Sequence, residues 1–228
     1  MITSLSIEIP MAEVRRLLGY PSGHLVPERV QSRLDALLEE SRGLVEARGT
    51  HAQYPVAAAE AVQLPRPGPA DTLGGFALGL VTISKGVEER AAAMLREGDA
   101  SGALLLDTIG SAAAEAAADV LGSRIAVGAT VGERTGFPDS DAGGVGEMAV
   151  SPCRISPGYG DWPLSAQEAI FARLPHGELG VRLLPSLLMV PRKSVTFALW
   201  FDAAGHAIGD LRGCSRCPLD HCPRRAAR

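Results

Sequence analysis

Lysine is nearly absent from this chain, which has 22 basic residues but only Lys85 and Lys193 as lysines. This arginine bias is explained more simply by genomic composition than by function. The net charge of -4 gives no excess of positive charge, so we expect neither nucleic acid nor an anionic membrane as a partner. Aromatic residues make up only 4% of the chain, yet 46% hydrophobic and 21% charged residues are typical of a globular protein.

Long apolar runs are missing as well. The first residues carry acidic side chains where a secretory signal needs a basic start and an apolar core. No run reaches the roughly 18–20 apolar residues that a membrane-spanning helix requires, and the most apolar stretch, 183–190, contains Pro185. We therefore expect a cytoplasmic protein without a membrane partner. In that compartment the four cysteines are not expected to form structural disulfides.

Helical spacing of apolar residues marks several segments of the chain. The predicted helices cover residues 10–19, a segment from about 27 to 44, and then 88–97, 101–121 and 165–174. In the last of these, Ser165 and Glu168 have the spacing of a capping box. Small residues at 110–114 in the longest helix permit close approach of a ligand or of another element, and tight packing on a sheet is the favoured interpretation.

Strand signals lie between and after these helices. Residues 76–83 read as a buried strand, 48–73 as irregular or β structure with a loop at 63–72, and 181–184 and 194–201 as further strands. Alternate residues of the last strand share one face, namely Val195, Phe197, Leu199 and Phe201. The sequence therefore predicts an α+β fold, with a mostly antiparallel sheet and helices packed on it.

Residues 154–163 form the most unusual segment, Arg-Ile-Ser-Pro-Gly-Tyr-Gly-Asp-Trp-Pro. Pro157 restrains the backbone, while Gly158 and Gly160 can adopt conformations closed to other residues, so the loop can present backbone groups to a ligand. The Arg154 guanidinium can bind a carboxylate in bidentate fashion. The rings of Tyr159 and Trp162 offer flat faces for an adenine or a sulfonium cation. For this segment taken alone, a rigid turn with Arg154 in a local ion pair is the simpler interpretation.

The segments that follow repeat a known order of motifs. Arg154, Pro157, Gly158 and Tyr159 precede a helix, and Leu184, Ser186, Met189, Pro191 and Ser194-Val195 come after it. In this order and spacing the chain resembles the activation (reactivation) domain of cobalamin-dependent methionine synthase, over about residues 76–208 and most strongly over 154–201. One departure is Arg192-Lys193, where the family has Gly-Ala. The resemblance implies a curved sheet with packed helices that binds S-adenosylmethionine (AdoMet).

The resemblance also implies roles for individual residues. Arg154 would hold the methionine carboxylate of AdoMet, and Tyr159 would contact the same ligand within the Pro157–Gly160 turn. Glu115 corresponds to an acidic residue of the helix that lines the pocket. His206 lies in the turn after the last strand and is either a residue at the rim of the pocket or an ordinary exposed turn histidine.

The C-terminal segment Arg-Gly-Cys-Ser-Arg-Cys-Pro-Leu-Asp-His-Cys has no counterpart in the family. Cys214, Cys217 and Cys222 have a C-x2-C-x4-C spacing that lets thiolates converge on one metal or cluster. Cys153 is a candidate fourth ligand, with His221 as its competitor. Zinc would simply hold the tail in place, whereas an iron–sulfur cluster would suit a reaction that consumes an electron.

Together these observations predict three parts: an N-terminal helical and irregular segment at 1–75, an AdoMet-binding core at 76–210 and a cysteine-rich tail at 211–228. The resemblance implies reductive methylation of cobalamin by AdoMet. The chain lacks the Asp-x-His-x-x-Gly loop of base-off cobalamin binding, so the cobalamin is expected on a separate methionine synthase or other corrinoid protein. A flavodoxin or ferredoxin is the expected electron donor. The alternatives are an electron-transfer activator of another corrinoid methyltransferase system and a non-catalytic corrinoid-protein binding module.

Overall fold

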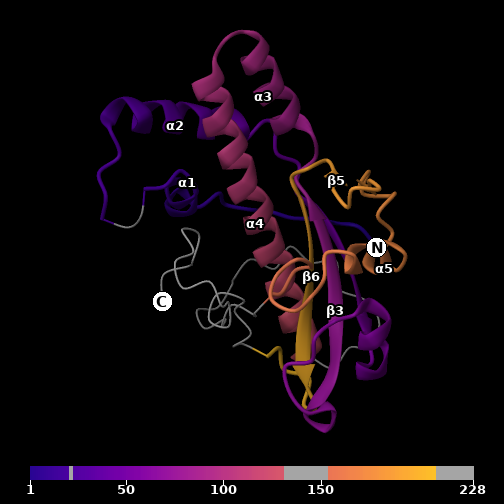
Figure 1. The fold of residues 1–228 in the computed structure, drawn as a ribbon. Coiled ribbons are helices and arrows are strands. Elements are labelled where there is room, and N and C mark those ends of the chain that lie inside the picture. Colours follow the sequence, from indigo (N-terminus) through magenta and orange to yellow (C-terminus); the bar gives the residue numbers. More distant parts are fainter. Residues whose placement is uncertain (21–22, 131–153, 209–228) are drawn as a thin grey trace.

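The computed structural model describes residues 1–20, 23–130 and 154–208, and its helices and strands follow one another along a single mixed fold (Figure 1). The first half contains β1 (Thr3–Ser4), α1 (Met11–Leu17), α2 (Glu28–Ser41), β2 (Arg48–Tyr54), the 3-10 turns η1 (Val56–Val62) and η2 (Ala70–Thr72), and β3 (Leu73–Thr82). The second half contains α3 (Gly86–Arg96), α4 (Ala100–Thr130), α5 (Ala166–Phe171), β4 (Arg182–Leu183), β5 (Met189–Val190) and β6 (Ser194–Asp202).

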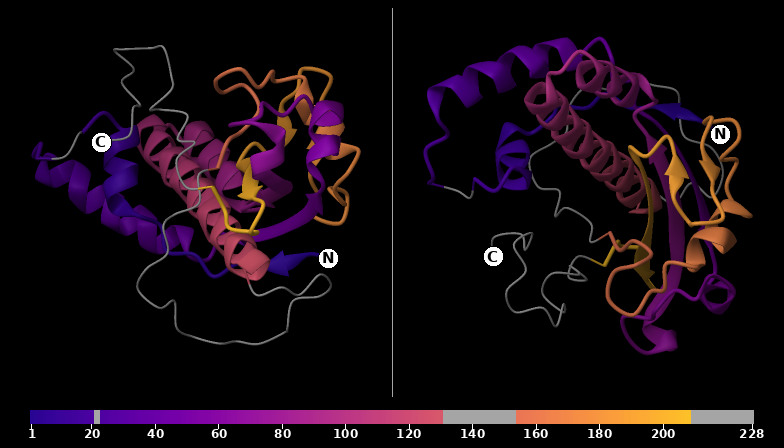
Figure 2. Two further views of the ribbon diagram at one scale, coloured as in Figure 1. Left: turned by 90° about the horizontal axis from the view of Figure 1, so that it is seen from below. Right: turned by 45° about the horizontal axis from the view of Figure 1, so that its top comes forward.

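The main sheet has four strands in the order β1-β2-β3-β6, and every pair in it is antiparallel. The long strands β3 and β6 form its centre and one edge, in a register that places Gly79 opposite Phe197. A Cβ on Gly79 would lie only 2.3 Å from the Phe197 ring, so glycine is needed there for the ring to lie across β3. Both long strands bend along their length (Figure 2). The α+β fold with a mostly antiparallel, curved sheet is confirmed, and the sheet is not closed into a barrel.

Helices cover one face of the sheet, with α4 lying along it (Figures 1 and 2). The core on this face, here called the helix-side core, joins alanines of α4 to alternate residues of the strands. Its strand residues include Ala77, Val81, Phe197, Leu199 and Phe201, and its α4 residues include Ala112, Ala113, Ala114, Ala117 and Ala118. The predicted alternation in the last strand and the preference for tight packing of the small residues are both confirmed, because small side chains let α4 approach the sheet closely.

The opposite face carries the turn-side core, which contains Phe76, Leu80, Trp200, Ala166 and Ile170 among others. Short elements rather than long helices cover it, namely η1, α5 and the two-stranded β4–β5 sheet. Trp162 belongs to this core: only 1% of it is exposed, and its indole N–H donates to the Val62 carbonyl at 2.9 Å. The expectation that Trp162 offers an open ring face to a ligand is therefore wrong.

Most predicted elements are present with shifted ends. The longest helix continues nine residues beyond Leu121, to Thr130, because its apolar face continues through Ile125. The helix predicted at 165–174 covers only Ala166–Phe171 and is followed by turns. The capping box is also wrong, since Ser165 has helical dihedrals and its side chain makes no capping hydrogen bond. Across the described ranges, no helix is both long enough and apolar enough to cross a membrane.

Candidate functional site

Arg154 enters the fold beside β6, the edge strand of the sheet. The next residue, Ile155, forms an antiparallel bridge with Ala198 through backbone hydrogen bonds of 2.8 and 3.1 Å. Alternation along an extended segment sends neighbouring side chains to opposite faces of the sheet. Ile155 accordingly packs on the turn-side core, while Arg154 lies on the helix side against α4 and Phe197.

The Arg154 guanidinium is held by two carboxylates from successive turns of α4. Its Nε donates to Asp119 Oδ1 at 2.9 Å, and its Nη2 lies 2.9 Å from Glu115 Oε2 and 2.8 Å from Asp119 Oδ1. Glu115 and Asp119 are four residues apart, so both point from the same face of the helix. The structure thus brings together two of the residues expected to bind AdoMet, Arg154 and Glu115, and it also forms the local ion pair that was the simpler interpretation of Arg154.

The rest of the Arg154 side chain is packed rather than free. Only 14% of it is exposed, and its guanidinium carbon lies 5.6 Å from the centre of the Phe197 ring. Its stem passes over Gly122, where an added Cβ would lie 3.3 Å from Arg154 Cδ. Burial alone would lower the pKa of Arg154, but the charges of Asp119 and Glu115 outweigh it and raise that pKa. The group is therefore a permanent, positioned cation.

Residues 157–162 form a tight turn directly after this arginine. Pro157 is buried, Gly158 and Gly160 have positive φ values of 89° and 57°, and Tyr159 is 68% exposed. The turn is closed by hydrogen bonds from the Gly158 amide to Trp162 O and from the Tyr159 amide to Ser156 O. Within the described residues the amide of Gly160 has no such partner, so it and the Tyr159 ring are the groups that the turn can offer to a ligand.

His206 lies at the other end of β6, in the turn that follows it. Its backbone amide donates to Asp202 Oδ1 at 2.8 Å, and its Nδ1 lies 3.4 Å from Asp202 Oδ2. The next residue, Ala207, bridges to Phe201 on the same outer edge of β6 that Ile155 meets. The His206 side chain is 66% exposed. His206 thus shares an edge of the sheet with Arg154, and no contact joins the two residues.

Asp119 was not among the predicted site residues, yet it contacts two nitrogen atoms of Arg154. A signal for it exists in the sequence, because α4 spells Asp-x-x-Gly-Ser twice, at 107–111 and at 119–123. Each unit has a cation lying over its glycine and bonded to its aspartate. In the first unit this cation is Lys193, whose Nζ lies 2.9 Å from Asp107 Oδ2 and 2.8 Å from Ser111 Oγ.

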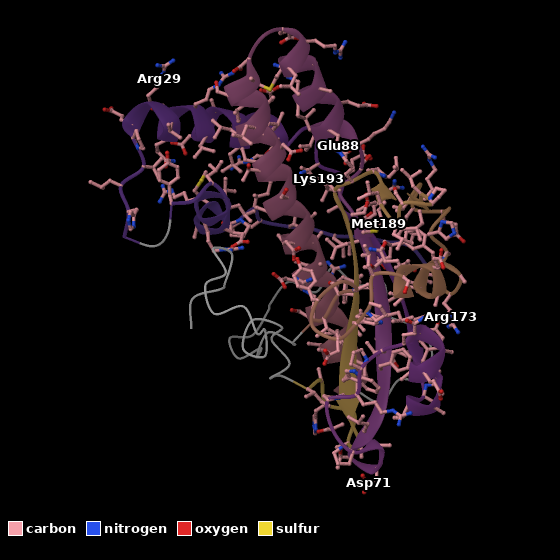
Figure 3. All side chains as sticks on the ribbon, viewed as in Figure 1. Arg29, Asp71, Glu88, Arg173, Met189 and Lys193 are labelled. Carbon is pink, nitrogen blue, oxygen red and sulfur yellow. The ribbon has the colours of Figure 1, made fainter. Side chains whose placement is uncertain are left out.

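The Lys193 cluster joins the start of β6 to the helices. Figure 3 marks Lys193 and Glu88 where α3 and α4 meet this end of the strand. The Lys193 amide donates to Glu88 Oε1 at 2.8 Å, and the neighbouring Arg192 lies 3.7 Å from both Glu88 and Asp107. The departure from the family at Arg192-Lys193 therefore creates ion pairs that fix β6 against α3 and α4.

The cysteines predicted to bind a metal, Cys153, Cys214, Cys217 and Cys222, all lie outside the described residues, as does His221. Within the ranges that the structure does describe, no group of three His, Cys, Asp or Glu side chains is arranged to hold a metal. A groove of about 490 Å³ exists between residues 5–9 and α2, lined mainly by Leu5, Ile7, Ile9, Leu38, Val45 and Ala47. None of the predicted site residues within the described ranges lines this groove.

This fold, a curved antiparallel sheet with α4 laid along it, is similar to that of a solved structure. The chain has a TM-score of 0.62 and 15% identity with "Crystal Structure of the MetH Reactivation Domain bound to AdoHcy", over 93% of this chain and 79% of that chain. The profile of the family "Vitamin B12 dependent methionine synthase, activation domain" matches residues 45–205. The chain belongs to this family. No curated protein matches its sequence.

The family match begins at residue 45, before β2, although the resemblance seen in the sequence was weak before Phe76. The matched range thus includes β2, which pairs with β3 from Tyr54 opposite Phe76 to Arg48 opposite Thr82. A single sequence identifies a strand such as β2 only weakly, because strand propensity depends on the neighbouring strands. The pairing of β2 with β3 shows its place in the sheet more clearly than its composition does.

Proposed function

We propose that the chain binds AdoMet at the Arg154 cluster and presents its methyl group to cobalamin held by a partner, restoring cobalamin that has become oxidised. Membership of the activation-domain family supports this proposal. The observation that carries it is the contact of Arg154 with Glu115, 2.9 Å apart, beside the Pro157–Gly160 turn. These are the positions at which the family resemblance had implied an AdoMet site.

Each residue has a chemical task in this proposal. Arg154 binds the ligand carboxylate through Nη1, which donates to none of the described residues. Glu115 accepts from the ligand ammonium. The exposed ring of Tyr159 covers the adenine or the sulfonium, while buried Pro157 and the positive φ values of Gly158 and Gly160 fix the turn. His206 forms the rim at the far end of the β6 edge.

The reaction needs a second substrate and an electron. We place the cobalamin on a partner, a methionine synthase or other corrinoid protein, because the family is the activation domain of a vitamin B12 dependent methionine synthase. A donor such as flavodoxin or ferredoxin provides one electron to reduce cob(II)alamin to cob(I)alamin. The reduced cobalt then takes the methyl group of AdoMet, the S–CH3 bond breaks with its electron pair left on sulfur, and S-adenosylhomocysteine (AdoHcy) leaves. The protein contributes binding and orientation.

We also propose that Cys153, Cys214, Cys217 and Cys222 hold zinc or an iron–sulfur cluster. The support is the C-x2-C-x4-C spacing of Cys214, Cys217 and Cys222, together with the positions of the described residues next to Cys153 and to the tail. Ile155 bonds to Ala198 and Ile208 bonds to Trp200, both on the outer edge of β6. Ile155 follows Cys153 by two residues, and Ile208 is the last described residue before the tail. The described neighbours of both cysteine segments therefore lie beside the same strand.

The test is calorimetric titration of the anaerobically purified protein with AdoMet, beside Arg154→Ala and Glu115→Gln variants. We expect saturable binding by the wild type, none by Arg154→Ala, and weakening of about tenfold or more by Glu115→Gln, the loss of one charge-assisted hydrogen bond. Arg192→Ala is the matched control, because this arginine is exposed and lies in the other ion-pair cluster. Absence of binding by folded wild-type protein would refute the proposal and favour a non-catalytic binding module.

A further inference from the structure

The charged groups around Arg154 do not cancel. One guanidinium is in contact with two carboxylates, Glu115 at 2.9 Å and Asp119 at 2.8 Å, so the formal charge of the cluster is +1 − 2 = −1. No other ion pair of Arg154 is formed within the part of the chain that the structure describes. The excess negative charge is accessible, because the Glu115 and Asp119 side chains are 48% and 57% exposed.

A ligand carboxylate can bind without displacing either acid. Asp119 occupies Nε and one side of Nη2, and Glu115 bonds to Nη2, which leaves Nη1 for the ligand. The Arg154 stem is fixed between Gly122 and the Phe197 ring, so the guanidinium cannot turn away from Asp119 easily. Asp119 therefore keeps its charge next to the ligand after binding.

We propose that Asp119 determines specificity at this site, by selecting a cationic adenosyl amino acid over the neutral product of demethylation. This inference rests on the proposed AdoMet site. AdoMet carries a carboxylate, an ammonium and a sulfonium, for a net charge of +1, whereas AdoHcy has lost the sulfonium charge and is neutral overall. Arg154 and Glu115 match the two groups that both ligands share. The charge of Asp119 remains for the group that only the methyl donor has.

The physical consequence is easier release of product than of substrate. Two charges a few ångströms apart at a protein surface attract each other more strongly as the effective dielectric constant between them falls. Part of this is lost to solvent because Asp119 is half exposed. We therefore expect the site to favour AdoMet over AdoHcy by about tenfold, the equivalent of about 1.4 kcal/mol.

The experiment compares three ligands by calorimetry: AdoMet, AdoHcy and sinefungin, an analogue that has an ammonium in place of the sulfonium. Wild-type protein is expected to bind AdoMet and sinefungin about tenfold more tightly than AdoHcy. In Asp119→Asn, both cationic ligands should weaken about tenfold while AdoHcy changes less than about twofold. Asp119→Glu should restore the preference. Asp35→Asn, the same substitution on α2 and outside the Arg154 cluster, should leave all three affinities unchanged.

A second measurement uses the wild type alone, so it tests the proposal even if Asp119→Asn does not fold. The AdoMet preference of the wild type should shrink as salt rises from about 50 mM to about 500 mM, because ions screen exposed charges. No binding of any ligand would refute the AdoMet site itself. Equal binding of all three, a parallel loss of all three in Asp119→Asn, or a preference independent of salt would overturn the role of Asp119 and leave the AdoMet site standing.

Discussion

Gly122 and Gly110 in α4 provide a test of how Arg154 is held. Both are interior positions of the same helix, and replacing glycine by alanine at such a position stabilises the helix by about 1 kcal/mol. Their surroundings differ. An added Cβ at Gly122 would lie 3.3 Å from Arg154 Cδ, a long side chain, whereas at Gly110 it would lie 2.7 Å from Val87 Cγ1, in a fully buried residue.

These distances predict opposite effects on stability. In Gly122→Ala the Arg154 stem has to shift by a few tenths of an ångström, which strains partly exposed ion pairs worth about 0.2–1 kcal/mol each. The helical gain offsets this strain, so the free energy of unfolding should stay level or rise by up to about 1 kcal/mol, or about 2–4 °C in Tm. In Gly110→Ala the same helical gain is set against an overpacking cost of about 1–3 kcal/mol, so the free energy of unfolding should fall by up to about 2 kcal/mol and Tm should fall with it.

The AdoMet affinity should depend on the position of Arg154 and not on the stability of the protein. A binding group must be held within about 0.5 Å of its place, and a shift of a few tenths of an ångström uses up much of this tolerance. Gly122→Ala should therefore lower AdoMet affinity by about threefold although the protein is no less stable. Thermal unfolding and calorimetric titration of the two variants measure both quantities. A fall in Tm for Gly122→Ala equal to that of Gly110→Ala, or unchanged AdoMet affinity, would refute the idea that Gly122 makes room for Arg154.

Two further predictions concern the turn after β6 and the cysteine cluster. The backbone amide of His206 lowers the pKa of the Asp202 carboxyl below its ordinary 3.8, so this interaction stabilises the fold above that pH and is lost as pH falls through the lowered value. The Tm difference between wild type and Asp202→Ala should therefore be constant near neutral pH and shrink below about pH 4, and a difference independent of pH would contradict this. For the cysteine cluster, metal analysis and the visible absorption spectrum of anaerobically purified protein should show bound zinc or iron, lost in a Cys214→Ser, Cys217→Ser double variant. Equal metal content in both proteins would exclude these ligands.

The sequence predicts the elements of the fold well where burial repeats with a regular period. The alternation in β6 identified the residues of the helix-side core, and the small residues of α4 indicated close packing on the sheet. Element ends were less predictable, because they depend on contacts with other parts of the chain. The short α5 shows this, since turns follow it directly where the apolar pattern continues to Leu174.

The site was predictable only in part, and Trp162 and Asp119 show why. In sequence, Trp162 stands beside Tyr159 in one loop, and both rings are equally suited to contact a ligand. The chain crosses the edge of the sheet between Arg154 and Trp162, so the tryptophan is buried in the turn-side core while Tyr159 stays exposed. A local motif does not show on which side of a sheet each of its members lies. That depends on the pairing of Ile155 with Ala198, 43 residues away along the chain (198 − 155).

Predicting the role of Asp119 requires a different kind of information. Nothing in the Arg154 segment indicates that two carboxylates rather than one approach the guanidinium, because both come from a helix more than thirty residues earlier. The repeated Asp-x-x-Gly-Ser pattern in α4 becomes informative only once the fold places a cation over each glycine, Lys193 at Gly110 and Arg154 at Gly122. The lysine over the first unit contacts Asp107 and Ser111, whereas the arginine over the second contacts Asp119 and, from one turn earlier in α4, Glu115. This difference leaves an excess negative charge beside Arg154, at the edge where the ligand is expected, and the proposed preference for a cationic ligand rests on it.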